Sequence, residues 1–145
     1  MFDISWGAFA LLALGATQVI IMLVTLYFHR ACSHRSVEFS PWLNRLFRFL
    51  AWFLISMDPR EFAAVHRKHH AFCDTPADPH SPVVYGWHGV LFNGLGLYRK
   101  ETANKQTIEK YGKGLPADPL DGFYRRYPSM GIALLALVLV AMLGG

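Results

Sequence analysis

His66, His69 and His70 are spaced at i, i+3 and i+4, so on an α-helix their three imidazoles lie in one narrow stripe. Neighbouring histidines in such a stripe repel each other when protonated and compete for the same hydrogen-bond acceptors when neutral. A shared transition-metal ion removes both problems, because neutral imidazole is a common ligand. A solvated basic helix is the alternative for a single histidine, but three on one face favour metal binding.

A second histidine pair, His29 and His34, precedes the stripe by about thirty residues. Five residues turn an ideal α-helix by about 500°, which leaves the two rings about 140° apart. The pair then binds one ion only if the helix ends between the two residues, and otherwise it binds two different ions. H-x-x-x-x-H alone is a weak signal, but its combination with H-x-x-H-H predicts a metal site.

The turn-rich segment DTPADPHSP after the stripe carries further polar candidates. Asp74 and Asp78 are suited to accept the free ring N–H of ligating histidines, and a role as cap and turn residues is the alternative. We expect His80 to be a hydrogen-bonding residue near the ligands, and His88 to be a hydrogen-bonding or solvent residue. Two cysteines, at positions 32 and 73, are interpreted as ordinary small side chains.

Composition places these residues in a membrane protein. Hydrophobic residues make up 53% of the 145 residues, which is not typical of a soluble domain, and the length allows one domain at most. The apolar segments then predict an all-α integral membrane domain. All 14 Lys and Arg residues lie between Arg30 and Arg126, as expected for a cytosolic segment between two spans. A net charge of +4 could indicate a nucleic-acid-binding protein, but this distribution of the basic residues argues against that function.

The predicted order of elements follows the apolar runs. Residues 4–28 form a transmembrane helix with Asp3 outside, residues 29–126 form the cytosolic segment, and residues 127–145 form a second transmembrane helix that is possibly cut short. Ser40 and Pro41 start an interfacial helix that extends to Met57 with its arginines toward lipid phosphates. The alternative for this helix is a re-entrant or short spanning hairpin. Another helix starts near Arg60, and a later one, over 86–100, is broken at Gly94 and Gly96.

The two histidine segments carry a family resemblance. HRACSHR and HRKHHAFCDTPADPH resemble the first two histidine boxes of the membrane fatty-acid desaturases, most closely the bacterial relatives of acyl-CoA desaturases. The later stretch YGWHGVLFNGLGLYRKETANKQTIEKYGKG is similar to the segment that follows the second box in that branch.

The resemblance implies a four-helix membrane fold with two iron ions on its cytosolic face, in a bacterial inner membrane. It marks five iron ligands here, namely His29, His34, His66, His69 and His70, and no catalytic residue beyond them. Dioxygen is the implied co-substrate, and the reaction introduces a double bond into a fatty acyl chain. Electrons come from a partner such as a ferredoxin or a cytochrome b5-type protein with its reductase, because the sequence has no flavin or nicotinamide fingerprint.

Two departures from the family pattern limit these expectations. The third histidine box and a further histidine region are absent from residues 1–145, so we expect the isolated chain to be an inactive N-terminal part of the fold. Ala64 and Val65 stand where animal acyl-CoA desaturases have Arg and Asp near the CoA headgroup, which leaves CoA, a carrier protein or a lipid as the acyl carrier. The alternative functions are a membrane di-iron hydroxylase and a non-catalytic metal-binding membrane protein.

Overall fold

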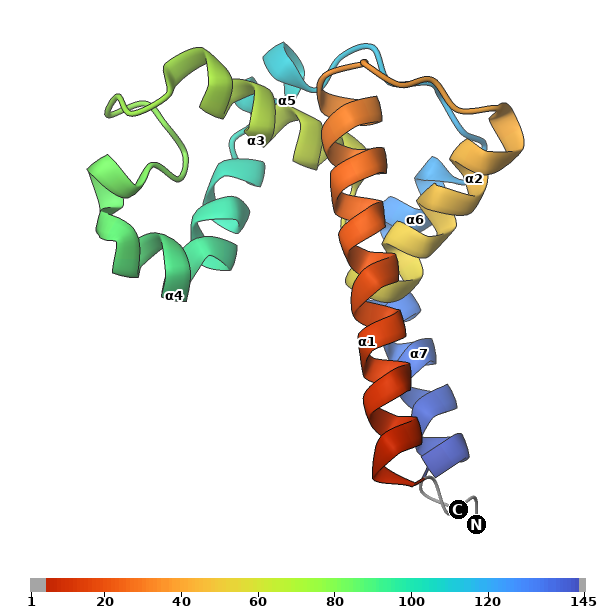
Figure 1. Ribbon diagram of the computed structural model, residues 1–145. Helices are drawn as coiled ribbons and strands as arrows, with labels where there is room; N and C mark the ends of the chain where they lie inside the picture. Colours follow the sequence, from red (N-terminus) through yellow and green to blue (C-terminus); the bar gives the residue numbers. More distant parts are fainter. Residues whose placement is uncertain (1–4, 144–145) are drawn as a thin grey trace. The chain divides into compact units, whose positions relative to one another are not determined.

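The structure is a computed structural model that describes residues 5–143, and the side chains of residues 5–141. All its regular elements within that range are helices, which confirms the predicted all-α class (Figure 1). The chain forms two compact units. The first comprises the described residues up to Tyr27, Glu38–Asp58 and the described residues from Ala117, and the second comprises Phe28–Val37 and Pro59–Pro116.

The longest helix combines α1 (Trp6–Met22) with a π-helical continuation, η1 (Leu23–Ser33). Ser5 caps its start, with the hydroxyl accepting from the Ala8 amide at 3.2 Å. Its 28 residues are long and apolar enough to cross a membrane, as predicted for 4–28, although the helix extends five residues further. The predicted location of Asp3 and the start of the span at Ile4 lie outside the described residues.

The helix predicted after Ser40 is α2 (Pro41–Leu50), followed by a π-helical turn, η2 (Ala51–Ile55). Proline occupies the first turn as expected, although the Ser40 side chain makes no capping hydrogen bond. The prediction that its arginines face phosphates is wrong for Arg48, whose side chain is only 4% exposed and pairs with Asp121. Burying a guanidinium requires such a partner, and the short helix α6 (Asp121–Arg126) supplies it.

The C-terminal apolar segment forms α7 (Pro128–Leu143), which packs against η2. Gly131 allows close approach, because a Cβ there would stand 2.9 Å from the Phe53 Cα atom. The Trp52 indole donates to the Tyr127 carbonyl at 2.8 Å and secures the start of α7. With 16 residues, α7 is shorter than the roughly 20 of a typical span, so the second transmembrane helix stays a prediction.

The second unit is built around α3 (Pro59–Phe72), which packs against α4 (Pro82–Thr102) and α5 (Lys105–Tyr111). Lys68 of α3 forms an ion pair with Glu101 of α4 at 2.8 Å. The irregular residues inside α4 are Gly86, with φ of 71°, and Asn93, rather than the predicted Gly94 and Gly96. All seven histidines lie in this unit.

Candidate metal centre

The π-helical winding of η1 brings His29 and His34 onto the same face. The His34 amide donates to the His29 carbonyl at 3.0 Å, so the two residues are one turn apart. Their ring centroids are 4.6 Å apart. The helix ends at Ser33, between the two histidines, and its last turns have π-helical winding instead of the α-helical winding that would separate the rings by about 140°. The Ser33 hydroxyl adds a hydrogen bond to the Phe28 carbonyl at 2.8 Å.

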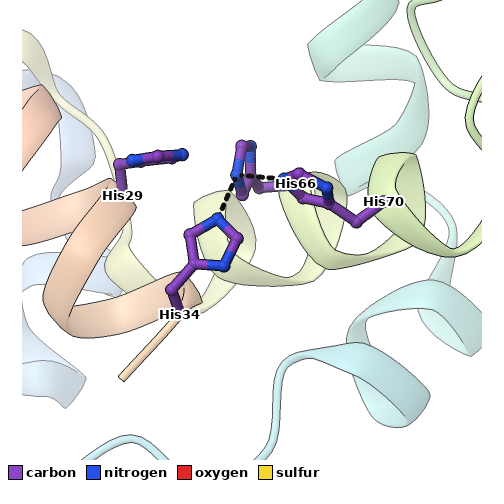
Figure 2. Close-up of side chains that lie close together, drawn as sticks. All are labelled: His29, His34, His66 and His70. Carbon is purple, nitrogen blue, oxygen red and sulfur yellow. Dashed lines mark hydrogen bonds between the residues drawn. The ribbon is translucent and has the colours of Figure 1, made fainter. Parts of the chain in front are cut away.

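α3 presents His66 and His70 to this pair (Figure 2). The Nε2 atom of His66 lies 3.1 Å from that of His34 and 3.0 Å from that of His70. One ligand atom from each of four histidines lies within 4.8 Å of the others, and the four are His29, His34, His66 and His70. Two nitrogens bound to one ion at about 2 Å are at most about 4 Å apart, so small ring rotations suffice.

The electrostatics of the cluster favour the neutral form of two of its imidazoles, those of His34 and His66. Burial, followed by the neighbouring charges of His70, His29, His34 and His69, lowers the pKa of His66 to about 3. Burial and the same kind of repulsion from His29 and His70 also lower the pKa of His34. A neutral imidazole offers its lone pair to a metal without first losing a proton, so this environment favours metal binding.

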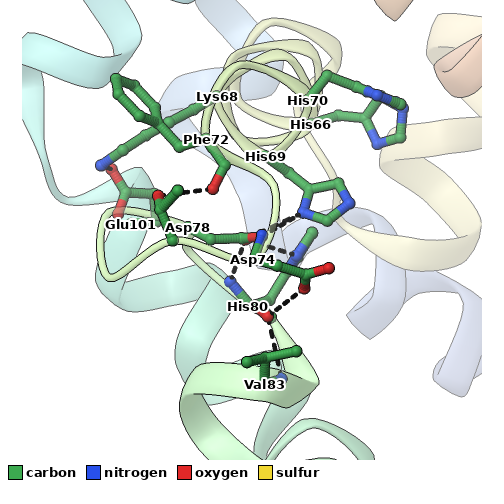
Figure 3. Close-up of polar contacts among 12 residues, drawn as sticks. His66, Lys68, His69, His70, Phe72, Asp74, Asp78, His80, Val83 and Glu101 are labelled. Carbon is green, nitrogen blue, oxygen red and sulfur yellow. Dashed lines mark hydrogen bonds and ion pairs between the residues drawn. The ribbon is translucent and has the colours of Figure 1, made fainter.

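His69 lies apart from the four-histidine cluster and belongs to a second group (Figure 3). Its Nδ1 atom is 2.9 Å from both carboxylate oxygens of Asp78, so Nδ1–H donates to the carboxylate, and in the neutral ring this arrangement leaves Nε2 with its lone pair. The ring of His80 lies 4.4 Å from that of His69, centroid to centroid. His69, Asp78 and His80 each offer one ligand atom within 4.8 Å of the others.

The turn after α3 explains why Asp78 stays a carboxylate although its side chain is fully buried. Burial alone would raise the pKa of Asp78. Hydrogen bonds from the His69 ring and from the amides of His80 and Asp74 outweigh this effect, so the net shift of the pKa is downward. Asp74 adopts a left-handed φ of 59° and accepts from the Ser81 hydroxyl at 2.6 Å instead of from a histidine. Asp78 is therefore the residue of the pair that contacts a candidate ligand.

The remaining residues discussed above take other positions. His88 is exposed and stacks on Trp87, with ring centroids 3.3 Å apart, and belongs to none of the metal-compatible groups among residues 5–143. Cys32 and Cys73 are free thiols. Sequence reasoning missed Arg67, which donates to four backbone carbonyls. The sequence offered one indication of this role: no acidic residue lies three or four positions from Arg67 on its helix, so its partners must come from elsewhere in the chain.

The donor set fits a transition-metal ion rather than calcium or magnesium. Four imidazole nitrogens, with no carboxylate in the same group, are the ligands that iron, zinc, copper or nickel accept. Hydrogen bonds among the rings cannot satisfy all of these nitrogens, because the Nε2 atom of His66 lies close to the Nε2 atoms of both His34 and His70 and can make only one such bond at a time. The second group mixes two imidazoles with a carboxylate, a set that also suits iron.

Comparison with known proteins agrees with this geometry. The sequence profile of the family described as "Fatty acid desaturase" matches residues 4–145. The chain is 32% identical over 146 aligned positions to a palmitoyl-monogalactosyldiacylglycerol delta-7 desaturase from Arabidopsis thaliana, covering 99% of this chain and 38% of that protein.

Over 91 residues the chain is 34% identical to the acyl-CoA 5-desaturase AL21 from Anemone leveillei, covering 63% of this chain and 28% of that protein. It therefore spans less than two-fifths of the length of either relative. No solved structure matches the chain significantly. Both relatives are plant proteins, so the bacterial branch stays a prediction.

Proposed function

Because the chain belongs to the fatty acid desaturase family, we propose that it supplies the first two histidine boxes of a di-iron desaturase. The reaction introduces a double bond into a fatty acyl chain, with dioxygen and two electrons as co-reactants. The observation that carries the proposal is the convergence of four imidazoles from two separate segments of the second unit.

The two groups of side chains divide the predicted ligands between two ions. His29, His34, His66 and His70 hold the first ion, and His69 contributes to the second through its free Nε2 atom. Asp78 fixes the His69 ring and its tautomer, as carboxylates do beside metal-bound histidines. The other ligands of the second ion come from a third histidine box of the kind that the family carries downstream.

The bound iron pair supplies the activation of dioxygen that attack on an unactivated methylene needs. The chain's own residues hold neutral nitrogens in place and keep protons off them, as the lowered pKa values of His34 and His66 indicate. Because His69 alone leaves the second ion short of ligands, we expect residues 1–145 by themselves to bind metal without desaturating an acyl chain.

The membrane placement follows from the apolar segments and the charges. The apolar residues 6–28 of the long helix cross the membrane and α7 forms part of a second span, while α2 lies at the interface. The basic residues between Arg30 and Arg126 then face the cytosol, and the histidines lie on that side. In a bacterium, this is the inner membrane.

The proposed substrate is a fatty acyl chain, in keeping with the membrane setting. Ala64 and Val65 are 0% and 2% exposed, so neither offers a surface contact to a carrier headgroup. The carrier is therefore one that does not use these two positions, such as CoA bound elsewhere, a carrier protein or a lipid. A separate protein, a ferredoxin or a cytochrome b5-type donor with its reductase, provides the electrons.

Metal content is the direct test of the site. The 145-residue chain is purified in detergent, loaded anaerobically with ferrous iron and freed of excess metal, and its iron is measured by mass spectrometry. We expect the wild type and His88→Ala to retain iron, and His66→Ala to lose it. Equal iron in all three proteins, or none in the wild type, contradicts the proposal.

Activity is tested in a chimera, because the chain matches less than two-fifths of its relatives. Residues 1–145 replace the aligned segment of the Arabidopsis delta-7 desaturase, and acyl products are analysed by gas chromatography in a desaturase-deficient bacterium. We expect iron-dependent unsaturated products that disappear with His66→Ala. Hydroxylated products would instead assign the chain to a hydroxylase, and metal binding without any product would favour a non-catalytic role.

A further inference from the structure

Arg67 lies between the candidate ligands of α3 and binds only backbone carbonyls. Its Nε atom donates to the Ser33 carbonyl at 2.9 Å, and Nη2 donates to the Cys32 carbonyl at 2.6 Å. On the other edge, Nη1 donates to the carbonyls of Tyr111 and Lys113, both at 2.8 Å. Among the described residues, no carboxylate forms an ion pair with it.

Three of these carbonyls lie at the ends of helices. Cys32 and Ser33 are the last residues of η1, and Tyr111 is the last residue of α5. The final carbonyls of a helix have no partner within it, and they form the negative end of its dipole. One planar guanidinium therefore caps two helix ends at once. A lysine ammonium has no fork with which to bind both pairs of carbonyls.

The second pair of carbonyls belongs to residues 111–114, a segment whose two glycines allow its backbone to pack closely against its neighbours. Gly112 is buried, and a Cβ there would stand 2.6 Å from the Ile108 carbonyl. Gly114 has a φ of 77°, a conformation that favours glycine. Arg35 also donates to the Lys113 carbonyl, at 2.8 Å. The sequence Tyr-Gly-Lys-Gly, which matches no phosphate loop, thus presents carbonyls to both arginines.

The consequence reaches the metal ligands through the peptide chain. Ser33, whose carbonyl Arg67 holds, directly precedes His34. Arg67 directly follows His66, and the Nε2 atoms of His34 and His66 are 3.1 Å apart. The end of η1 is thus joined to α3 by the hydrogen bonds of Arg67 and by the contact between the His34 and His66 rings.

We propose that Arg67 is a positioning residue for the metal site, because its guanidinium fixes the end of η1 against α3 and so keeps His34 within reach of His66. The proposal rests on the metal site proposed above. Without the arginine, the carbonyls of Cys32 and Ser33 lose their hydrogen bonds to α3, and the position of His34, the next residue, is less firmly held.

The test uses the full 145-residue chain in detergent, with Arg67→Lys, Arg67→Gln and, as a matched control, Lys68→Gln. The control removes the adjacent positive charge, whose partner is Glu101 of α4. Two readouts are made: amide hydrogen exchange of peptides covering residues 29–36 in the metal-free protein, and ferrous iron affinity by anaerobic titration. Circular dichroism checks that each variant stays helical.

We expect both Arg67 variants to exchange faster over residues 29–36 than the wild type and to bind iron about 10–100-fold more weakly. Lys68→Gln should match the wild type in both readouts. In a further variant, Arg67→Ala, added millimolar guanidinium should slow amide exchange over residues 29–36, because it can occupy the place of the lost side chain, whereas ammonium should not. If Arg67→Lys retains wild-type exchange and affinity, or if Arg67→Gln changes neither, the proposal is wrong.

The exchange readout separates this proposal from the function on which it rests. If the wild type binds no iron while Arg67→Gln still accelerates exchange, the proposed metal site fails but Arg67 holds the two segments together. If the wild type binds iron and Arg67→Gln leaves exchange and affinity unchanged, the metal site stands and the positioning role fails.

Discussion

The ring of His34 lies 4.6 Å from the ring of His29, centroid to centroid, and one turn of π-helix further along the chain. A spacing of five residues is one turn only in this winding. In an α-helix the same two side chains would diverge. The local change of helix type in η1 is therefore what allows the first histidine pair to act as one unit.

Inserting one alanine after Ala31 is expected to separate this pair. Six residues exceed one π-helical turn, so the His29 ring no longer faces the second histidine of the pair, and iron affinity should fall by more than about tenfold. The matched control inserts alanine after Pro116, in the irregular connection of residues 115–117, where no candidate ligand follows. Iron titration of both variants checks this, and equal affinities would falsify the link between winding and binding.

Replacing Asp78 by Asn should loosen His69. In the wild type, two backbone N–H groups donate to the Asp78 carboxylate. The side-chain amide of Asp78→Asn would turn its own NH2 donor toward one of them, so the turn should lose about 1–3 kcal/mol of stability. Iron bound through His69 should weaken by about 10–100-fold. Asp118→Asn, in the first unit, serves as the control for loss of a carboxylate. Iron stoichiometry and thermal unfolding in detergent provide the measurements.

The pKa of His66 predicts how the metal-free protein responds to acid. The folded state holds this pKa at about 3, whereas an unfolded chain has a value of about 6.5. Between these values the unfolded state binds a proton that the folded state does not, so stability falls as the pH decreases through that window. Because His66 is only half buried, the loss is smaller than the full shift implies.

Nuclear magnetic resonance of histidine-labelled protein, with the denatured chain as reference, measures this directly. The His66 ring should stay neutral from pH 7 to pH 5, whereas the denatured rings should titrate near 6.5. A His66 titration midpoint at the denatured value would show that burial and the neighbouring rings do not shield the site.

The contact between α7 and η2 predicts a stability effect in the first unit. A methyl group at Gly131 would meet the backbone of Trp52 and Phe53, which cannot move as a flexible side chain can. Gly131→Ala should therefore destabilise the protein by about 1–3 kcal/mol. Gly122→Ala is the control, since no atom lies within 4 Å of a Cβ there. Thermal unfolding of both variants in detergent compares them.

Sequence patterns were sufficient where the signal is local. Pro41 and Pro59 occupy the starts of α2 and α3, close to the predicted starts, because proline is tolerated in the first turn. The proximity of His66 and His70 also follows from α-helical spacing. The apolar runs along the chain were enough to predict the helical class and the long apolar helix near the N-terminus, whereas the second of the two predicted spans stays a prediction.

Tertiary contacts determine what the sequence did not predict. The π-helical winding of η1 is not encoded in any residue spacing, and the burial of Arg48 depends on Asp121, more than seventy residues later. His69 shares the α3 stripe, yet the buried carboxylate of Asp78 draws its ring into another group. Each of these results from a partner whose position only the folded chain defines.

The middle of α3 cannot accept an inserted or deleted residue without losing contacts. The five consecutive residues His66–His70 all make specific contacts. His66 and His70 belong to the histidine cluster, and the three residues between them bind four carbonyls, Glu101 and Asp78, respectively. One inserted or deleted residue rotates every later side chain by about 100° and breaks these contacts together. By contrast, residues 115–117 form an irregular connection without helix or strand. We therefore expect a change of chain length within this segment of α3 to disrupt several contacts at once, whereas a change of length in the connection leaves these contacts in place.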